Sequence, residues 1–315
     1  MILTFFLSLV GFYILIKGAD ILVRGASSVA KILQISSWTM GVILVGIGTS
    51  VPEFAITFIS AFTTNTSIGL GTVIGSNTLN ILLILGLAAI IRPLQMRPNW
   101  VWKDFPVNIL SVLIAISFVF LPAGPALGFS RTEGVIMFLI FLAWLFWTAL
   151  RKKSDGEAEL ETRAVALPLA FLLILAGLLG VLLGGKWVVE GAEEFARLFG
   201  VSEALIGLTI VGIGTSLPEL VVSAVAAWRK NFGIAVGNII GSNIFDFLGI
   251  LGFTAMFHKI SFPEKLLPDI FITAASALLL FLAMFIGKKY VLKRWQGLVF
   301  IALYLAYLFF IIQRG

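Results

Sequence analysis

Three acidic residues lie in the middle of long apolar segments, where a charged side chain is costly. Of the sixteen Asp and Glu residues, only Glu53, Glu219 and Asp246 have this position. Each ionised carboxylate inside a bilayer costs about 2.5–3.5 kcal/mol on insertion scales. No Lys or Arg lies at the same depth, unless one reaches in from the ends of the first or sixth apolar segment. The partner of these carboxylates is therefore expected to be a bound cation.

Uncharged oxygen atoms surround these acids. Pro52 and Pro218 lack an N–H, so the carbonyls of Gly48 and Gly214 lose their helical partners. The adjacent glycines, which include Gly46 and Gly212, make local unwinding easier. Hydroxyl and amide groups complete the set: Thr49, Ser50, Ser76, Asn77, Asn80, Thr215, Ser216, Ser242 and Asn243. Hard cations such as Ca²⁺ prefer oxygen ligands, and a chain with no Cys and one His offers little to softer metals.

Structural roles for the same residues compete with this interpretation. Ser50-x-x-Glu53 and Ser216-x-x-Glu219 each have the spacing of a capping box, in which the glutamate bonds back to its own helix start. Small residues such as Ser76 also allow close helix packing in membranes. Asn77 and Asn243 could equally bond across helices. Capping alone would leave two charges in hydrocarbon without compensation, so an ion site is favoured.

The composition of the chain is that of an integral membrane protein. The 315 residues are 60% hydrophobic and 12% charged, with a mean hydropathy of +1.09. A soluble fold has too little interior for so much apolar surface. Ten transmembrane helices are predicted, near 2–27, 37–62, 68–91, 100–121, 132–150, 165–196, 203–228, 232–257, 266–286 and 294–312.

The chain contains an internal duplication. Gly18, Gly25, Gly41, Thr49, Pro52 and Glu53 recur, always 166 residues later, as Gly184, Gly191, Gly207, Thr215, Pro218 and Glu219. The segment GTVIGSNTLN from Gly71 returns as GNIIGSNIFD from Gly237. With five spans in each half, the second half enters the membrane from the opposite side. The predicted fold is therefore all-α, with two inverted five-helix repeats (1–150 and 165–315), a cytoplasmic linker (151–164) and broken helices at the midplane.

The distribution of basic residues predicts the orientation. If both termini lie outside the cell, the inside loops hold 14 Lys and Arg residues and the outside segments hold 5. We therefore expect a multi-pass protein of the cell membrane with extracellular termini. The basic residues are spread among short loops, which argues against nucleic acid as a partner. No protein partner, cofactor or catalytic motif is indicated, so an enzyme is not expected.

The doubled GTS-x-PE motif resembles a signature of known transporters. Each glutamate is followed 27 residues later by Asn80 or Asp246. In this the chain resembles the sodium/calcium exchangers of the cation/calcium antiporter superfamily, over nearly its whole length. The resemblance implies that Glu53 and Glu219 bind Ca²⁺ with the main-chain oxygens of Thr49 and Thr215. It implies flanking Na⁺ sites at Ser50, Ser76, Ser216 and Ser242, with backbone oxygens near Gly46 and Gly212.

The resemblance also implies a mechanism and a subtype. Asn80 and Asp246 would face one another at the centre, and helices one and six would form a moving gate. The linker is too short for the cytosolic calcium-sensing domains of the animal exchangers, which indicates the prokaryotic type. The neutral Asn80 argues against a potassium requirement, since potassium-dependent relatives tend to carry an acid there. Proton-coupled relatives usually show GN-x-x-E in place of GTS-x-PE.

These residues predict coupling as well as binding. Two ionised glutamates balance one Ca²⁺ or two Na⁺, so the carrier should reorient mainly when it is occupied and should act as an antiporter. Ca²⁺ and Na⁺ are the expected transported ions. A calcium/proton antiporter is the nearest alternative, because protonation could also neutralise the empty site. A cation channel lined by the same carboxylates is a third possibility, against which the inverted repeat argues.

Overall fold

The computed structural model describes residues 2–62, 66–120, 127–151, 164–198 and 212–314, and within them the chain is almost entirely helical. The first half contains α1 (Ile2–Ile32), α2 (Ser37–Met40), η1 (Gly41–Gly46), α3 (Ile47–Thr49), α4 (Val51–Ala61), α5 (Thr66–Leu79), η2 (Asn80–Ile84), α6 (Leu85–Ile91), α7 (Pro98–Phe120) and α8 (Arg131–Ala149). The second half contains α9 (Leu167–Leu198), α11 (Gly212–Gly214), α12 (Leu217–Trp228), α13 (Phe232–Ile244), η4 (Phe245–Ile250), α14 (Leu251–Phe257), η5 (Glu264–Leu266), α15 (Leu267–Ala283) and α16 (Arg294–Arg314).

Eight of these helical stretches are long and apolar enough to cross a membrane, and a bent pair raises the number to nine within the described ranges. The bent pair joins Ser37–Thr49 to Val51–Ala61 at 47°. It corresponds to the predicted span 37–62, whose break at Ser50 lies next to Pro52. The predicted span 203–228 is described only from residue 212, and the linker from 152 to 163 lies outside the described residues. The chain is thus a multi-pass helical membrane protein.

The first span is longer than the sequence predicted. The predicted end at residue 27 rested on the polar run that begins there, but α1 continues to Ile32. The hydroxyls of Ser27 and Ser28 donate to the carbonyls of Val23 and Arg24, at 2.6 and 2.9 Å. Serines that bond back to their own helix in this way remain helical without a solvent partner. A polar residue therefore marked no helix end here.

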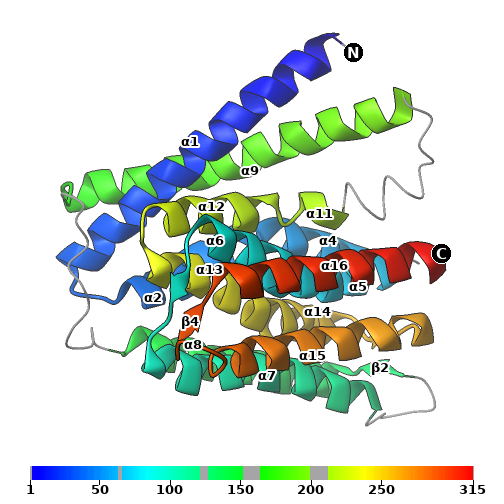
Figure 1. Cartoon of the computed structure of the whole chain (residues 1–315). Coiled ribbons are helices and arrows are strands. Elements are labelled where there is room, and N and C mark those ends of the chain that lie inside the picture. The colour runs from blue at the N-terminus through cyan, green and yellow to red at the C-terminus, as the bar shows by residue number, and fades with distance from the viewer. Residues whose placement is uncertain (1, 63–65, 121–126, 152–163, 199–211, 315) are drawn as a thin grey trace.

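α1 and α9 lie side by side across one face of the remaining helices, and α1 begins and α16 ends toward the same end of the molecule (Figure 1). Glycines of α9 permit the close approach. A Cβ at Gly177 would lie 2.6 Å from the backbone nitrogen of Leu22, and one at Gly184 would lie 2.6 Å from that of Leu15. An ion pair between Asp20 of α1 and Arg229, just after α12, joins the pair to the rest of the bundle.

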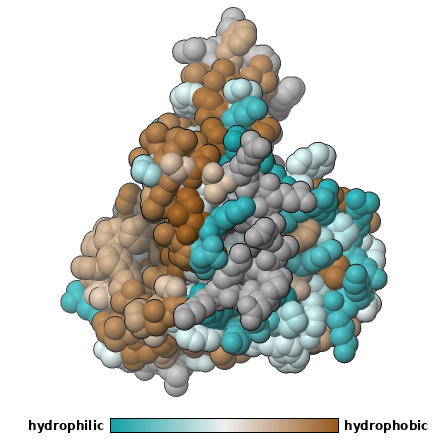
Figure 2. Space-filling view, turned by 90° about the vertical axis from the view of Figure 1, so that its left-hand side faces the viewer, coloured by the Kyte–Doolittle hydropathy of each residue, from teal (hydrophilic) through white to brown (hydrophobic). Residues whose placement is uncertain are grey.

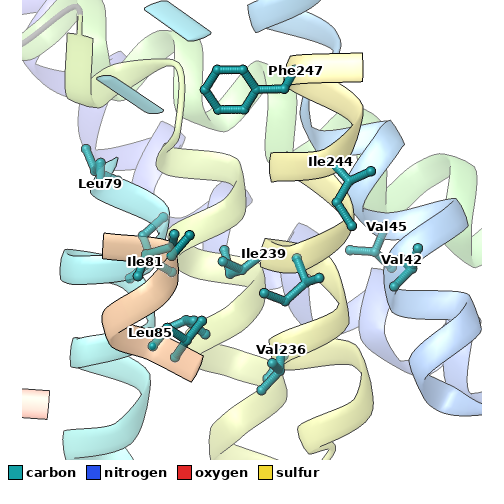
Figure 3. Close-up of a cluster of buried hydrophobic side chains, with 14 of the residues drawn as sticks. Val42, Val45, Leu79, Ile81, Leu85, Val236, Ile239, Ile244 and Phe247 are labelled. Atoms are coloured by element: carbon teal, nitrogen blue, oxygen red, sulfur yellow. The ribbon is translucent and has the colours of Figure 1, made fainter. Parts of the chain in front are cut away.

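Behind this pair, buried apolar side chains fill the space between η1, α13 and the η2–α6 segment. Val42 and Val45 approach Ile239 and Ile244 from one side, and Ile81 lies on the other (Figure 3). At the periphery, two pairs of two-residue strands connect loops from the two halves. β1 (Leu94–Gln95) pairs with β4 (Val291–Leu292), and β2 (Gly128–Phe129) pairs with β3 (Ile260–Ser261).

The surface of one end agrees with a membrane protein. Viewed from the end that carries α2 and β4, hydrophilic side chains gather on part of the face, whereas apolar side chains cover the flank and the projecting upper part (Figure 2). Many large apolar side chains are exposed, including Phe146 at 67% and Phe309 at 62%. Lipid is the solvent that such a flank requires.

Candidate ion-binding site

The two broken helices bring Ser50 and Ser216 to the starts of α4 and α12. Each serine has a φ near that of a helix and a ψ close to zero, and neither side chain caps its own helix. The capping-box interpretation is therefore wrong for both motifs. An N-cap needs an extended backbone to aim its oxygen at the N–H groups that follow, and these two serines do not have it. Their hydroxyls are free for other partners.

Each hydroxyl reaches the glutamate of the other half of the chain. Ser50 donates to Oε1 of Glu219 at 3.2 Å, and Ser216 donates to Oε1 of Glu53 at 3.3 Å. The glutamates are 1% exposed and lie in the first turns of α4 and α12. Helix N-termini favour negative charge, because their N–H groups are unpaired. The two predicted motifs therefore form one site.

Asp246 lies in a second cluster that also crosses between the halves. Its Oδ2 accepts hydrogen bonds from Nδ2 of Asn77 at 2.8 Å and from Oγ of Ser76 at 3.3 Å. The corresponding residues of the other halves are Asn243 and Asn80, and Asn80 donates to Oδ1 of Asn243 at 2.9 Å. The two asparagines weighed as helix-bridging groups thus have that role.

Asn80 and Asp246 both lie at the beginning of π-helical segments, η2 and η4. Such segments widen the helix and are frequent at functional sites. The sequence contained no signal for them. They place the carboxamide and the carboxylate at the start of a local distortion, one turn after Ser76 and Ser242.

Asn238 was missed in the sequence, although it contacts both motifs. Its side chain accepts from Oγ1 of Thr49 at 3.1 Å and donates to the main-chain oxygen of Glu219 at 3.3 Å. One turn later, Ser242 donates to the main-chain oxygen of Gly46 at 3.0 Å. A polar residue in a strongly apolar segment was the available signal, as it was for the acids.

Several buried oxygen atoms in this region have no hydrogen-bond partner. They include one carboxylate oxygen on each of Glu53, Glu219 and Asp246, the hydroxyl of Thr215, and the amide oxygens of Asn77 and Asn80. An unpaired buried polar atom costs about 1–3 kcal/mol, and more if it is charged. So many unmet acceptors in one region fit a set of oxygen ligands for a hard cation.

No fixed cation serves these acids among the described residues. The ion pairs there join other groups, such as Lys186 to Glu190 on α9. Two further buried acids, Asp104 and Asp269, pair with Arg151 and Arg314 at 2.7 and 2.6 Å. These two acids lie early in α7 and α15 and had not been singled out. Buried carboxylates that are paired therefore differ from Glu53, Glu219 and Asp246, which are not.

The structure places most of the predicted ligands within this connected network. Thr49, Ser50, Ser76, Ser216, Ser242, Asn80 and the carbonyl of Gly46 all take part in the contacts described above. Gly212 begins α11 at the edge of the described residues. No group of three or more Asp, Glu, His or Cys side chains with metal-binding geometry occurs in the described ranges. A cation would therefore need the hydroxyl and main-chain oxygens as well as the carboxylates.

Comparisons with known proteins bear on what the site is for. Residues 3–150 and 169–313 match the family described as "Sodium/calcium exchanger protein". The sodium/calcium exchanger MaX1 of Methanosarcina acetivorans is 32% identical, over 96% of this chain and 97% of its own. The putative antiporter CaxA of Alkalimonas amylolytica is 33% identical, over 95% of each chain. A solved structure of the sodium-calcium exchanger NCX_Mj, soaked with Na⁺ and Ca²⁺, matches with a TM-score of 0.83 and 33% identity over 97% of both chains.

Proposed function

Because the chain belongs to the sodium/calcium exchanger family, we propose that it is a secondary active antiporter that exchanges Na⁺ for Ca²⁺ by alternating access. The observation that carries this proposal is the pair of buried glutamates. Each accepts a hydrogen bond from a serine of the other half and keeps an unpartnered oxygen, with no fixed cation nearby among the described residues. The family is one of exchangers rather than enzymes, which agrees with the lack of a catalytic motif.

The proposed Ca²⁺ site uses the carboxylates of Glu53 and Glu219 with the main-chain oxygens of Thr49 and Thr215. The proposed Na⁺ sites use the hydroxyls of Ser50, Ser76, Ser216 and Ser242, with main-chain oxygens near Gly46 and Gly212. Asn80 and Asp246 belong to the centre of the same site. The hydrogen bonds that already connect these groups support a shared site, because an ion that displaces one contact disturbs the others.

Charge balance provides the coupling. Two ionised glutamates match one Ca²⁺ or two Na⁺. An empty site would carry uncompensated charge through a low-dielectric passage, at several kcal/mol per ion, and an occupied site avoids this cost. The protein therefore reorients when it is loaded and rarely when it is empty. Na⁺ and Ca²⁺ compete, because they use the same carboxylates.

Alternating access rests on the proposed architecture of ten spans in two inverted repeats, 1–150 and 165–315. Contacts that recur at the offset of the sequence repeat support it. Thr57 donates to the carbonyl of Gly69, and Ser223 donates to that of Ala235, at 3.3 and 3.0 Å. The two strand pairs and the two Asp–Arg ion pairs are likewise duplicated. Inverted repeats with a site at their interface are typical of secondary transporters.

The deciding experiment is ⁴⁵Ca²⁺ uptake into proteoliposomes that contain the purified protein. An outward Na⁺ gradient at fixed pH should drive uptake, and collapse of that gradient should stop it. Uptake that follows a pH gradient and ignores Na⁺ would identify a calcium/proton antiporter instead. Calcium flux that needs no counter-ion would identify a channel. Either result would overturn the proposal.

A further inference from the structure

Asn238 is the one buried amide that connects the two glutamate motifs directly. It lies in α13 and is fully buried. Its side chain contacts Thr49, which immediately precedes the break before α4, and the main chain of Glu219 in the first turn of α12. Its third contact, with Oγ of Ser223 at 2.9 Å, holds it to α12. The residue therefore joins the starts of α4 and α12 across the site.

The orientation of the amide follows from its partners. The carbonyl of Glu219 can only accept, so it must face the NH₂ group. The hydroxyl hydrogen of Ser223 is used on the carbonyl of Ala235, at 3.0 Å, so this hydroxyl also accepts from the NH₂ group. The amide oxygen is then left to accept from Thr49. All three contacts are satisfied in only one of the two possible amide orientations.

The other half of the chain lacks this bridge. At the repeat offset, Asn238 corresponds to Thr72, whose hydroxyl donates to Ile68 of its own helix at 2.9 Å. Thr49 corresponds to Thr215, whose buried hydroxyl has no partner in the described part of the chain. One side of the site is thus fixed by an amide, and the other side is not.

From this geometry we propose that Asn238 is a positioning residue that sets the spacing between Thr49 and Glu219 and so favours Ca²⁺ binding. The proposal rests on the antiporter function and on the assignment of these two residues to Ca²⁺. A divalent ion gains from several oxygens held at fixed positions, and outer contacts of ligands commonly affect metal affinity about 10–100-fold. The serine hydroxyls assigned to Na⁺ do not contact Asn238 in the described hydrogen bonds. Ca²⁺ should therefore depend on this residue more than Na⁺ does.

The test compares Asn238→Ala with Thr72→Ala, its counterpart in the first half. After Na⁺-driven Ca²⁺ uptake by the unaltered protein is established, the KM for Ca²⁺ should rise about tenfold in Asn238→Ala. Its maximal rate and the Na⁺ concentration for half-maximal exchange should change less than about twofold, since the Na⁺ ligands keep their contacts. Thr72→Ala should behave like the unaltered protein. An unchanged KM, or equal shifts for both ions, would contradict the positioning role.

A double-mutant cycle provides a second measurement. Thr49→Val removes the hydroxyl and keeps the main-chain oxygen, whereas Thr49→Ser keeps both. If Asn238 acts through this hydroxyl, Thr49→Val should raise the KM for Ca²⁺, Thr49→Ser should not, and the double variant Thr49→Val/Asn238→Ala should be no worse than Asn238→Ala. Additive effects would overturn the inference. Absence of Na⁺-driven uptake in the unaltered protein would instead refute the antiporter function itself.

Discussion

Each glutamate of the site depends on a serine that lies more than a hundred and fifty residues away in the chain. The hydrogen bonds from Ser50 to Glu219 and from Ser216 to Glu53 are reciprocal. Only one oxygen of each carboxylate is used in this way, and the second is buried without a partner. The serines therefore orient the carboxylates and leave the remaining oxygens to an ion.

At the scale of the residue, we predict that Glu53→Gln abolishes exchange without unfolding the protein. The amide keeps the shape of the side chain but removes the charge that balances the ion. Ca²⁺-driven uptake should fall to background, and added Ca²⁺ should no longer raise the melting temperature, because ligand stabilisation requires binding. Intrinsic fluorescence during heating measures this, and the chain has 8 Trp residues. Glu264→Gln, at an exposed glutamate, is the matched control.

Normal uptake by purified Glu53→Gln would remove Glu53 from the proposed ligands. Glu219→Gln should lose uptake in the same way, since the two carboxylates share one site. A difference between the two variants would indicate that only one of them carries the ion.

The sequence alone was sufficient to select the acids and hydroxyls of the site, because a polar atom in an apolar span is conspicuous. It could not show how they pair. Ser50 and Glu53 have the spacing of a local capping box, yet their partners lie in the other half. Asn238 was missed because an amide with three local partners has no spacing signature. Partners distant in sequence become visible only once the halves are packed together.

At the scale of the element, the contact between α1 and α9 depends on glycine. We predict that Gly184→Ala destabilises the protein by about 1–3 kcal/mol, the usual range for overpacking. The new Cβ would lie 2.6 Å from the backbone nitrogen of Leu15 and 2.7 Å from the carbonyl oxygen of Gly11, and backbone atoms cannot give way cheaply. Thermal unfolding in detergent would measure the loss.

The adjacent Gly185 provides the control. The nearest described atom to a Cβ at Gly185 is Cδ of Pro218 at 3.8 Å, which is an ordinary contact. Gly185→Ala should therefore keep the stability of the unaltered protein. Equal losses for the two variants would show that helix propensity or lipid contact, and not the α1–α9 packing, decides the effect.

The ion pair between Asp104 of α7 and Arg151 after α8 leads to another prediction. The side chain of Asp104 is fully buried, and Arg151 approaches both of its oxygens. Arg151→Met should destabilise the protein by about 3–5 kcal/mol, because it leaves a buried charge alone. Adding Asp104→Leu should restore much of the loss. Lys186→Met, which breaks an exposed pair on α9, should have little effect on the melting temperature.

Helix positions followed from hydropathy, whereas details of the helices did not. The predicted span 100–121 corresponds to α7, and the break in the predicted span 37–62 lies beside Pro52 as the missing N–H requires. The π-helical turns at Asn80 and Asp246 were not predicted, because hydropathy reports burial and not hydrogen-bond register. The end of α1 was misplaced because two serines found partners within their own helix.

At the scale of the whole molecule, the orientation in the membrane stays a prediction. The chain has no Cys, so single cysteines can be introduced without a background. Lys289 and Lys259 are exposed and lie in loops next to β4 and β3, which belong to opposite ends of the molecule (Figure 1). A membrane-impermeant maleimide should label Lys259→Cys from outside intact cells and Lys289→Cys only after the membrane is opened. The reverse pattern would invert the topology.

The halves of the molecule were readable from the sequence, because the repeated motifs keep a constant offset. What the offset could not show was where the repeat fails. Thr72 stands where Asn238 would be expected, and Asn80 stands opposite Asp246 in the alignment of the halves. These differences give one half more polar contacts than the other around a site that both must share.

The reciprocal serine–glutamate bonds have a consequence for dissecting the protein. Neither half by itself contains both a carboxylate and the hydroxyl that orients it. A chain cut between residues 152 and 163 should recover ion binding only when the two fragments reassemble. Added Ca²⁺ should then act as an adhesive between them, so that fragment association becomes a direct readout of occupancy.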